Sequence, residues 1–205
     1  MLMLTIAFII NLIIIVCEGI TLSHIRGKRN ILKYYTYLQN FLSLIASLVF
    51  SVCLLACTVS GKAIPEFAKG LRYVATCGLM ATMFVFIVFL GAGKKIAITE
   101  DDFLRHFSPR AANIILHYVC PMLSLISFVF FERSVNLSNG IWTGIAAIPS
   151  CVYWIVYFIL SAAKVWEEPY DFASGGSKNN LGEMLPAFLI PVSFIAFSFI
   201  LWNVQ

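Results

Sequence analysis

Residues 110–131 read RAANIILHYVCPMLSLISFVFF, an apolar segment that carries one histidine, His117. A helix needs about 20 apolar residues to cross the hydrocarbon core of a bilayer, and this segment is long enough. A titratable ring is costly to bury at membrane depth, so an intramembrane histidine marks a candidate functional site. The segment therefore indicates a membrane-spanning helix and the region in which to look for chemistry.

Segments of similar length and composition make up most of the remaining chain. Hydrophobic residues are 60% and charged residues 12% of the 205 residues, whereas soluble domains have about 25% charged residues. The composition predicts an all-α integral membrane bundle of six transmembrane helices, in a single membrane domain that covers residues 1–205. The expected spans are about residues 2–22, 35–58, 71–92, 110–131, 141–163 and 184–202.

The first segment begins with MLML and has no basic residues before its apolar run. The run is longer than a signal-peptide core, and Cys17-Glu18-Gly19 is a poor cleavage site. We interpret the segment as a retained helix. The alternative is a cleaved signal, which would leave a protein of five helices.

Basic residues are distributed unevenly between alternate loops. We call the side of the odd-numbered loops the A side. Because lysine and arginine are enriched in cytoplasmic loops, the A side is expected to face the cytoplasm, with both termini outside. The scattered charges do not resemble a nucleic-acid footprint. Loops one, three and five contain ten basic residues: Arg26, Lys28, Arg29, Lys33, Lys94, Lys95, Arg105, Arg110, Lys164 and Lys178. Loops two and four contain four: Lys62, Lys69, Arg72 and Arg133.

The cysteines and histidines show no metal-ligand spacing. All six cysteines lie in apolar segments, where cysteine packs as a small soft residue. A zinc site built from His24, His106 and His117 is an alternative, but their flanking residues lack the spacing of zinc ligands. The chain also lacks a glycine-rich phosphate loop and a dinucleotide fingerprint, so we expect no cofactor.

Two pairs of polar residues lie in the second and fourth segments. Thr36 and Asn40 are four residues apart, as are Asn113 and His117, so each pair shares a helix face. Both segments begin on the A side if six segments cross the membrane. If these two helices are neighbours, the four side chains converge in one leaflet.

Each of these residues also has a structural interpretation. Thr36 can bond to a carbonyl of its own helix, as threonine usually does in membrane helices. Asn40 and Asn113 can join helices by hydrogen bonds worth about 0.6 kcal/mol on average. His117 can be a structural histidine bonded to a tyrosine or threonine across the bundle.

Together the four residues have the chemistry of an esterase. A threonine hydroxyl is a poor nucleophile until a base removes its proton, and histidine, with an ordinary pKa of about 6.5, is suited to that role near neutral pH. Asn40 or Asn113 would orient the imidazole or donate to an oxyanion. A site near headgroup depth would meet acyl esters whose chains lie in the bilayer. Glu18 is the only acidic residue within the expected spans, so a Ser-His-Asp triad is not expected.

The fifth loop is rich in aromatic residues. It contains Trp166, Pro169, Tyr170 and Phe172, followed by Ser174-Gly175-Gly176-Ser177. One interpretation is an aromatic belt at the membrane surface. The other is a lid over a site that opens on the A side.

The order of these motifs resembles the androgen-induced-gene/FAR-17a family, which includes bacterial Pr6Pr-type membrane proteins. The resemblance rests on Lys33-Tyr34-Tyr35-Thr36-Tyr37-Leu38-Gln39-Asn40, on Asn113 and His117 followed by Pro121, and on the aromatic-proline stretch after the fifth segment. It covers the second to fifth segments, roughly two thirds of the chain. Characterised members are intramembrane threonine hydrolases that cleave fatty acid esters of hydroxy fatty acids.

The resemblance implies that Thr36 is the nucleophile and His117 the general base. It also implies that Trp166, Pro169, Tyr170 and Phe172 correspond to the Tyr-Pro-Phe segment of the family, which reads Glu-Pro-Tyr-Asp-Phe here. We therefore expect a membrane hydrolase of lipid esters, with membrane lipids as its surroundings and a lipid ester as its substrate.

Two other classes of function compete with the hydrolase. In a non-catalytic lipid-binding or accessory membrane protein, His117 and the asparagines would only hold helices together. A transporter is disfavoured, because the two halves of the chain show no repeat and no matched broken helices.

Overall fold

The computed structural model describes residues 2–25, 34–90, 109–132, 137–163, 165 and 180–205. These residues form helical rods, and the described part of the chain contains no strand. The predicted all-α membrane bundle is confirmed. The first three rods are α1 (Leu2–Ile25), α2 (Tyr35–Ser60) and α3 (Glu66–Val85), and α3 continues into a π-helical turn, η2 (Phe86–Leu90).

The fourth rod alternates between α-helical and π-helical turns. It consists of α4 (Pro109–Ile114), η4 (Ile115–Val119), α5 (Cys120–Ile126) and η5 (Ser127–Phe131). The last two rods are α6 (Ile141–Ala162) and α7 (Asn180–Val204).

Five of the rods contain a segment long and apolar enough to cross a membrane. These segments are Leu2–Ser23, Tyr35–Ser60, Glu66–Val88, Ala111–Phe131 and Ile141–Leu160. The sixth rod, α7, has a shorter apolar stretch among the described residues, Leu189–Val204.

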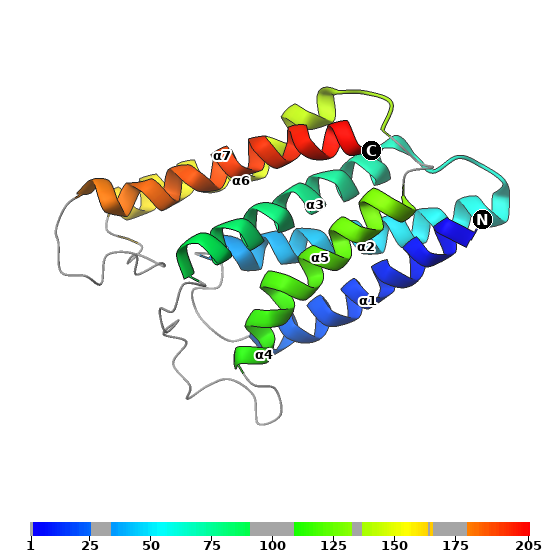
Figure 1. Cartoon of the computed structure of the whole chain (residues 1–205), viewed down its shortest axis with the longest axis horizontal. Helices are drawn as coiled ribbons and strands as arrows, with labels where there is room; N and C mark the ends of the chain where they lie inside the picture. Colours follow the sequence, from blue (N-terminus) through cyan, green and yellow to red (C-terminus); the bar gives the residue numbers. More distant parts are fainter. Residues whose placement is uncertain (1, 26–33, 91–108, 133–136, 164, 166–179) are drawn as a thin grey trace.

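The rods lie side by side, and the chain reverses direction between successive rods (Figure 1). Both termini lie at one end of the bundle, next to the turn between α2 and α3. The C-terminal end of α1 and the N-terminal ends of α2, α4 and α7 lie at the opposite end (Figure 1). This arrangement is the one expected if every rod crosses the membrane once, and the end without termini corresponds to the A side.

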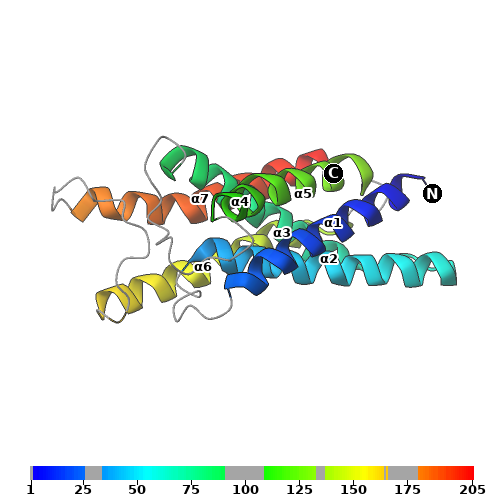
Figure 2. The same ribbon diagram turned by 90° about the horizontal axis from the view of Figure 1, so that it is seen from below.

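α3 is the central helix of the bundle. It contacts α2, α5, α6 and α7. It passes between α2 and the α6–α7 pair in the first view (Figure 1), and it lies in the middle of the bundle in the view from below (Figure 2). In its apolar window 72% of the residues are buried, compared with at most 39% in the other four spans.

Small residues explain why α3 can occupy this position. A Cβ atom added at Gly70 would overlap the Trp142 ring of α6, and one added at Gly78 would overlap the Gln39 amide of α2. Small residues let the backbones of membrane helices approach closely. The two glycines therefore set the contacts of α3 with the neighbours on either side.

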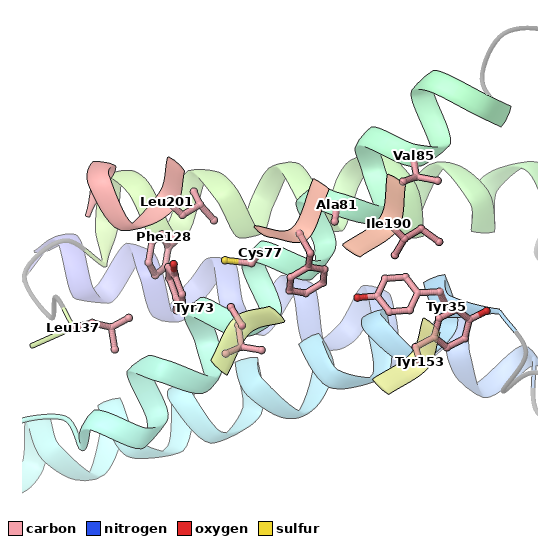
Figure 3. Close-up of a cluster of buried hydrophobic side chains, with 13 residues drawn as sticks. Tyr35, Tyr73, Cys77, Ala81, Val85, Phe128, Leu137, Tyr153, Ile190 and Leu201 are labelled. Atoms are coloured by element: carbon pink, nitrogen blue, oxygen red, sulfur yellow. The ribbon is translucent and has the colours of Figure 1, made fainter. Parts of the chain in front are cut away.

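Aromatic and aliphatic side chains fill the space between α3, α6 and α7. Tyr73 and Phe128 lie towards one end of this cluster, and Tyr35 and Tyr153 lie towards the other (Figure 3). The Tyr73 hydroxyl donates to the Ser198 carbonyl of α7. The Tyr35 and Tyr153 rings are 4.9 Å apart between centroids.

The C-terminal end of α2 lies at Ser60, directly before a glycine, the residue type that commonly ends helices. Gly61 caps the helix with a φ of 69°, a left-handed conformation that suits glycine, and the Cys57 carbonyl accepts a bond from the cap.

The assignment of Arg72 to the second loop was wrong. Arg72 is fully buried within α3, and residues 66–72 form the first turns of that helix. Lys69 lies in the same helix and Arg110 lies in α4, so without these three residues the charge comparison between odd and even loops becomes nine against two. The asymmetry that predicts the orientation is therefore slightly larger.

Candidate functional site

Thr36 and His117 line the same pocket. The pocket has a volume of about 20 Å³, which is enough for about one water molecule. It lies between the first turn of α2, the end of α3, η4 and α7. Its lining residues are Tyr35, Thr36, Ala81, Thr82, Val85, Phe86, His117 and Ile190.

The hydroxyl of Thr36 differs from those of other threonines in the bundle. Thr36 lies in the first turn of α2, so the residue four positions earlier precedes the helix. Within the described part of the chain, the Thr36 hydroxyl makes no hydrogen bond. Five others donate to a carbonyl three or four residues earlier: Thr21, Thr58, Thr76, Thr82 and Thr143.

The backbone at Thr36 also favours negative charge. The first amide N–H groups of a helix have no carbonyl partner within that helix, and they carry the positive end of its dipole. The N-cap residue, Tyr34, makes no side-chain hydrogen bond to these groups. An alkoxide or oxyanion at Thr36 would therefore lie close to the positive end of the α2 dipole.

His117 is buried and its ring is held by packing. It is 8% exposed, and its Nδ1 atom is buried without a hydrogen-bond partner. Its ring stacks on Phe86, with the centroids 4.0 Å apart and the planes at 15°. The Tyr118 ring packs edge-on against Phe86, with the centroids 5.4 Å apart.

Both members of the stacked pair lie in π-helical turns. Phe86 begins η2, and His117 is in the middle of η4. Such turns are rare and frequently occur at functional sites, because the extra residue changes the direction of the side chains that follow. The sequence analysis predicted neither turn.

The structure does not bring the two asparagines into the pocket lining. Asn40 is fully buried, and its amide nitrogen donates to the Thr36 carbonyl at 2.8 Å. Its Oδ1 atom is buried without a partner. Asn113 is partly buried on α4 and makes no hydrogen bond to His117. The π-helical turn between them explains this, because four residues do not complete a π-helical turn.

Tyr35 forms a wall of the pocket and is fixed by its own contacts. Its hydroxyl donates to Gln39 Oε1 at 3.3 Å, and Gln39 Nε2 donates to the Ala75 carbonyl at 3.2 Å. The Phe194 ring of α7 packs edge-on, 6.3 Å away. Tyr35, Ala81, Val85 and Ile190 gather at one end of the aromatic cluster (Figure 3).

Several residues of the sequence-based site lie outside the described part of the chain. These are the possible lid residues Trp166, Pro169, Tyr170 and Phe172. The alternative zinc site also depends on His106 and on the His24 side chain, which are outside it as well. Among the described residues, no group of three or more histidine, cysteine, aspartate or glutamate side chains forms a metal site.

A second polar centre lies towards the end of the bundle that carries the termini. Arg72 Nε donates to Glu132 Oε1 at 3.2 Å, and both side chains are buried. Arg72 also donates to Thr76 and Ser124, and Glu132 accepts from Asn11 and Ser127. The sequence analysis missed this ion pair, because it placed both residues in loops. The signal that could have found it is a single arginine and a single glutamate flanking apolar spans.

No known family model, curated protein or solved structure matches this chain. The resemblance to the androgen-induced-gene/FAR-17a family therefore stays a prediction that rests on the short motifs alone.

Proposed function

We propose that this protein is a multi-pass membrane hydrolase that cleaves lipid esters with Thr36 as nucleophile and His117 as general base. The observation that carries the proposal is that these two residues, 81 positions apart in the sequence, line one pocket. The unbonded Thr36 hydroxyl supports it further, because a nucleophile must be free to attack.

In the first half of the reaction, the Thr36 Oγ atom attacks the ester carbonyl carbon. His117 accepts the hydroxyl proton, and the carbonyl oxygen becomes an oxyanion next to the N–H groups at the start of α2. The carbon–oxygen bond to the alcohol then breaks, and His117 returns the proton to the leaving alkoxide. An acyl ester of Thr36 remains.

In the second half, a water molecule attacks the acyl-Thr36 carbonyl. His117 accepts a proton from this water, and the second tetrahedral intermediate collapses to a fatty acid. The proton returns to the Thr36 oxygen. The pocket has room for about one water molecule next to these groups.

The proposed substrate class is a lipid ester, such as a fatty acid ester of a hydroxy fatty acid. Apart from Thr36, Thr82, His117 and the Tyr35 hydroxyl, the pocket lining is apolar. Thr36 lies in the first turn of α2, so the reacting carbonyl would lie near one membrane surface with its acyl chain in the bilayer. The motif resemblance supports the same substrate class.

The test is turnover of fatty acid esters of hydroxy fatty acids by purified protein in detergent. Thr36→Ala is expected to abolish hydrolysis, and His117→Ala to lower kcat by about 10²–10⁴-fold, the usual contribution of a general base. Thr58→Ala is a matched control on the same helix, since the Thr58 hydroxyl bonds to its own helix at the far end. Hydrolysis at the wild-type rate by folded Thr36→Ala protein would contradict the proposal.

A non-catalytic lipid-binding protein is the second candidate. The observation that favours it is the absence of a hydrogen-bond partner on His117 Nδ1, since catalytic histidines are usually oriented by such a bond. In that case, His117→Ala and Thr36→Ala would change thermal stability or lipid binding, and the wild type would hydrolyse none of the fatty acid esters tested.

For the orientation, we propose that the A side is cytoplasmic and that both termini are outside. The excess of basic residues in the odd loops supports this assignment. A reporter domain that is active only outside the cytoplasm should be active when it is fused to either terminus, and a reporter that is active only in the cytoplasm should be inactive at both. Cytoplasmic activity of both fusions would reverse the orientation, and opposite results at the two ends would contradict six crossings.

A further inference from the structure

A second titratable group, Glu18 of α1, is buried but does not line the Thr36–His117 pocket. Glu18 is fully buried, and both carboxylate oxygens lack a hydrogen-bond partner. It is not among the residues that line the pocket. An ionised carboxylate without partners is among the most costly groups to place in an apolar interior.

The groups around Glu18 come from each neighbouring helix. The Ser43 hydroxyl of α2 lies near the Glu18 carboxyl, and Arg72 of α3 is close enough to attract a negative charge there. A charge on Glu18 would also be felt by the thiols of Cys17 on the same helix and Cys120 on α5. Arg72 is the only one of these that carries a permanent positive charge.

The charge of Arg72 is already compensated by another residue. Its guanidinium pairs with Glu132 at 3.2 Å and also donates to Thr76 and Ser124. Among the buried described residues, the acidic and basic side chains are Glu18, Arg72 and Glu132, besides His117. An ionised Glu18 would therefore leave one uncompensated negative charge inside the bundle.

The face of α2 towards this region carries hydroxyl groups without partners. Ser43, Ser47 and Ser51 recur at four-residue intervals, and all three are buried with unpaired Oγ atoms. A hydroxyl can both donate and accept, so Ser43 suits a carboxylic acid as well as a carboxylate. This row does not supply a positive charge.

We propose that Glu18 is a proton-binding site within the membrane, where the carboxyl group is held as the neutral acid at neutral pH beside the Ser43 hydroxyl. The bound ligand is a proton. Glu18 keeps this proton because the nearby Arg72 charge is already compensated by Glu132 and cannot also balance a Glu18 carboxylate. The proposal is independent of the esterase chemistry, because Glu18 does not line the pocket.

Infrared difference spectroscopy of the full chain in lipid at neutral pH tests this assignment. The wild-type spectrum minus that of Glu18→Gln should contain a carbonyl band of a protonated carboxyl group. The matched control, Glu132→Gln, should remove carboxylate bands only, because Glu132 is paired with Arg72. A difference spectrum for Glu18→Gln that contains carboxylate bands and no protonated band would overturn the proposal.

Carbodiimide labelling of the wild type is a second test that needs no variant. Apolar carbodiimides react with protonated carboxyl groups, so the adduct should lie on Glu18 and be absent from Glu132 when peptides are analysed by mass spectrometry. If the ligand is a proton, exchanging choline chloride for sodium chloride in the buffer should leave the extent of carbodiimide labelling of Glu18 unchanged. Protection by sodium would show that the site binds a metal cation, and an adduct on Glu132 but not on Glu18 would show that the proton is elsewhere; either result overturns the assignment.

Discussion

At the scale of single residues, the candidate site depends on two uncommon positions. Thr36 lies in the first turn of its helix and its hydroxyl makes no hydrogen bond within the described part of the chain, whereas Thr58 and Thr82 bond to carbonyls of their own helices. His117 lacks an orienting hydrogen bond and is held by a stacked ring. The proposed nucleophile thus has an unbonded hydroxyl within the described residues, and the proposed base is held in its orientation by packing.

Phe86→Leu is expected to lower kcat by about tenfold, equivalent to about 1.4 kcal/mol of transition-state stabilisation. Leucine keeps the pocket apolar but cannot stack on the imidazole, so His117 would occupy more than one orientation. KM is expected to change less than kcat, because leucine keeps this wall of the pocket apolar. Steady-state kinetics on a lipid ester checks this split, and an unchanged kcat would show that stacking does not position the base.

The sequence could identify Thr36 and His117 but not the contacts that surround them. Polar residues are so rare in these spans that face and depth were enough to select them. Phe86 is one of 18 phenylalanines, and nothing local distinguishes it from those that face lipid. Asn40 and Asn113 were selected by four-residue spacing, which fails where a π-helical turn intervenes, as it does before His117.

At the scale of helices, the packing of α2 on α3 positions the first turn that carries Thr36. The two helices approach closely at Gly78, since Gln39 occupies the space of a side chain there. Gln39 in turn bonds to the Tyr35 hydroxyl and the Ala75 carbonyl. A change at Gly78 would therefore be transmitted to the pocket wall.

Gly78→Ala is expected to destabilise the protein by about 1–3 kcal/mol, as overpacking of a core typically does. The added methyl group would displace Gln39 and break its two hydrogen bonds. Gly144→Ala on α6 is the matched control, because its Cβ would meet no atom within 4 Å, and alanine favours a helix by about 1 kcal/mol over glycine. Thermal unfolding in detergent compares the two. Equal midpoints for both variants would contradict the close approach of α2 and α3.

Helix positions were predicted well, and helix contacts were not. Apolar length alone located the rods, including the start of the fourth at Pro109. It could not show that α3 is central, because its first turns contain Lys69 and Arg72 and look amphipathic in isolation. The partner of Arg72 is Glu132, 60 residues later, and only the tertiary structure brings the two together.

At the scale of the whole molecule, two polar centres lie in different regions of an apolar bundle. The Thr36–His117 pocket lies at the start of α2, near the A side, and the Arg72–Glu132 pair lies between the early turns of α3 and the end of η5, towards the other end. The pair joins the central helix α3 to the fourth rod, and Asn11 connects α1 to it. It therefore links α1, α3 and the fourth rod.

Glu132→Leu is expected to cost about 3–5 kcal/mol, because it leaves the buried Arg72 charge without a partner. The double variant Arg72→Met/Glu132→Leu should recover most of this loss, since an apolar replacement of a buried pair is often neutral or stabilising. Thermal unfolding in detergent measures both. A double variant no more stable than the single variant would show that the ion pair is not the source of the effect.

The central claim is that Thr36 is a nucleophile activated by His117, and fluorophosphonate labelling tests it most directly. The Thr36 oxygen would displace fluoride from phosphorus, and mass spectrometry of the purified full chain locates the modified peptide. We predict an adduct on Thr36 in the wild type and in Thr58→Ala, and none at this position in His117→Ala. Folded wild-type protein that hydrolyses lipid esters and yet carries its adduct on another residue, or is modified equally without His117, would contradict the account.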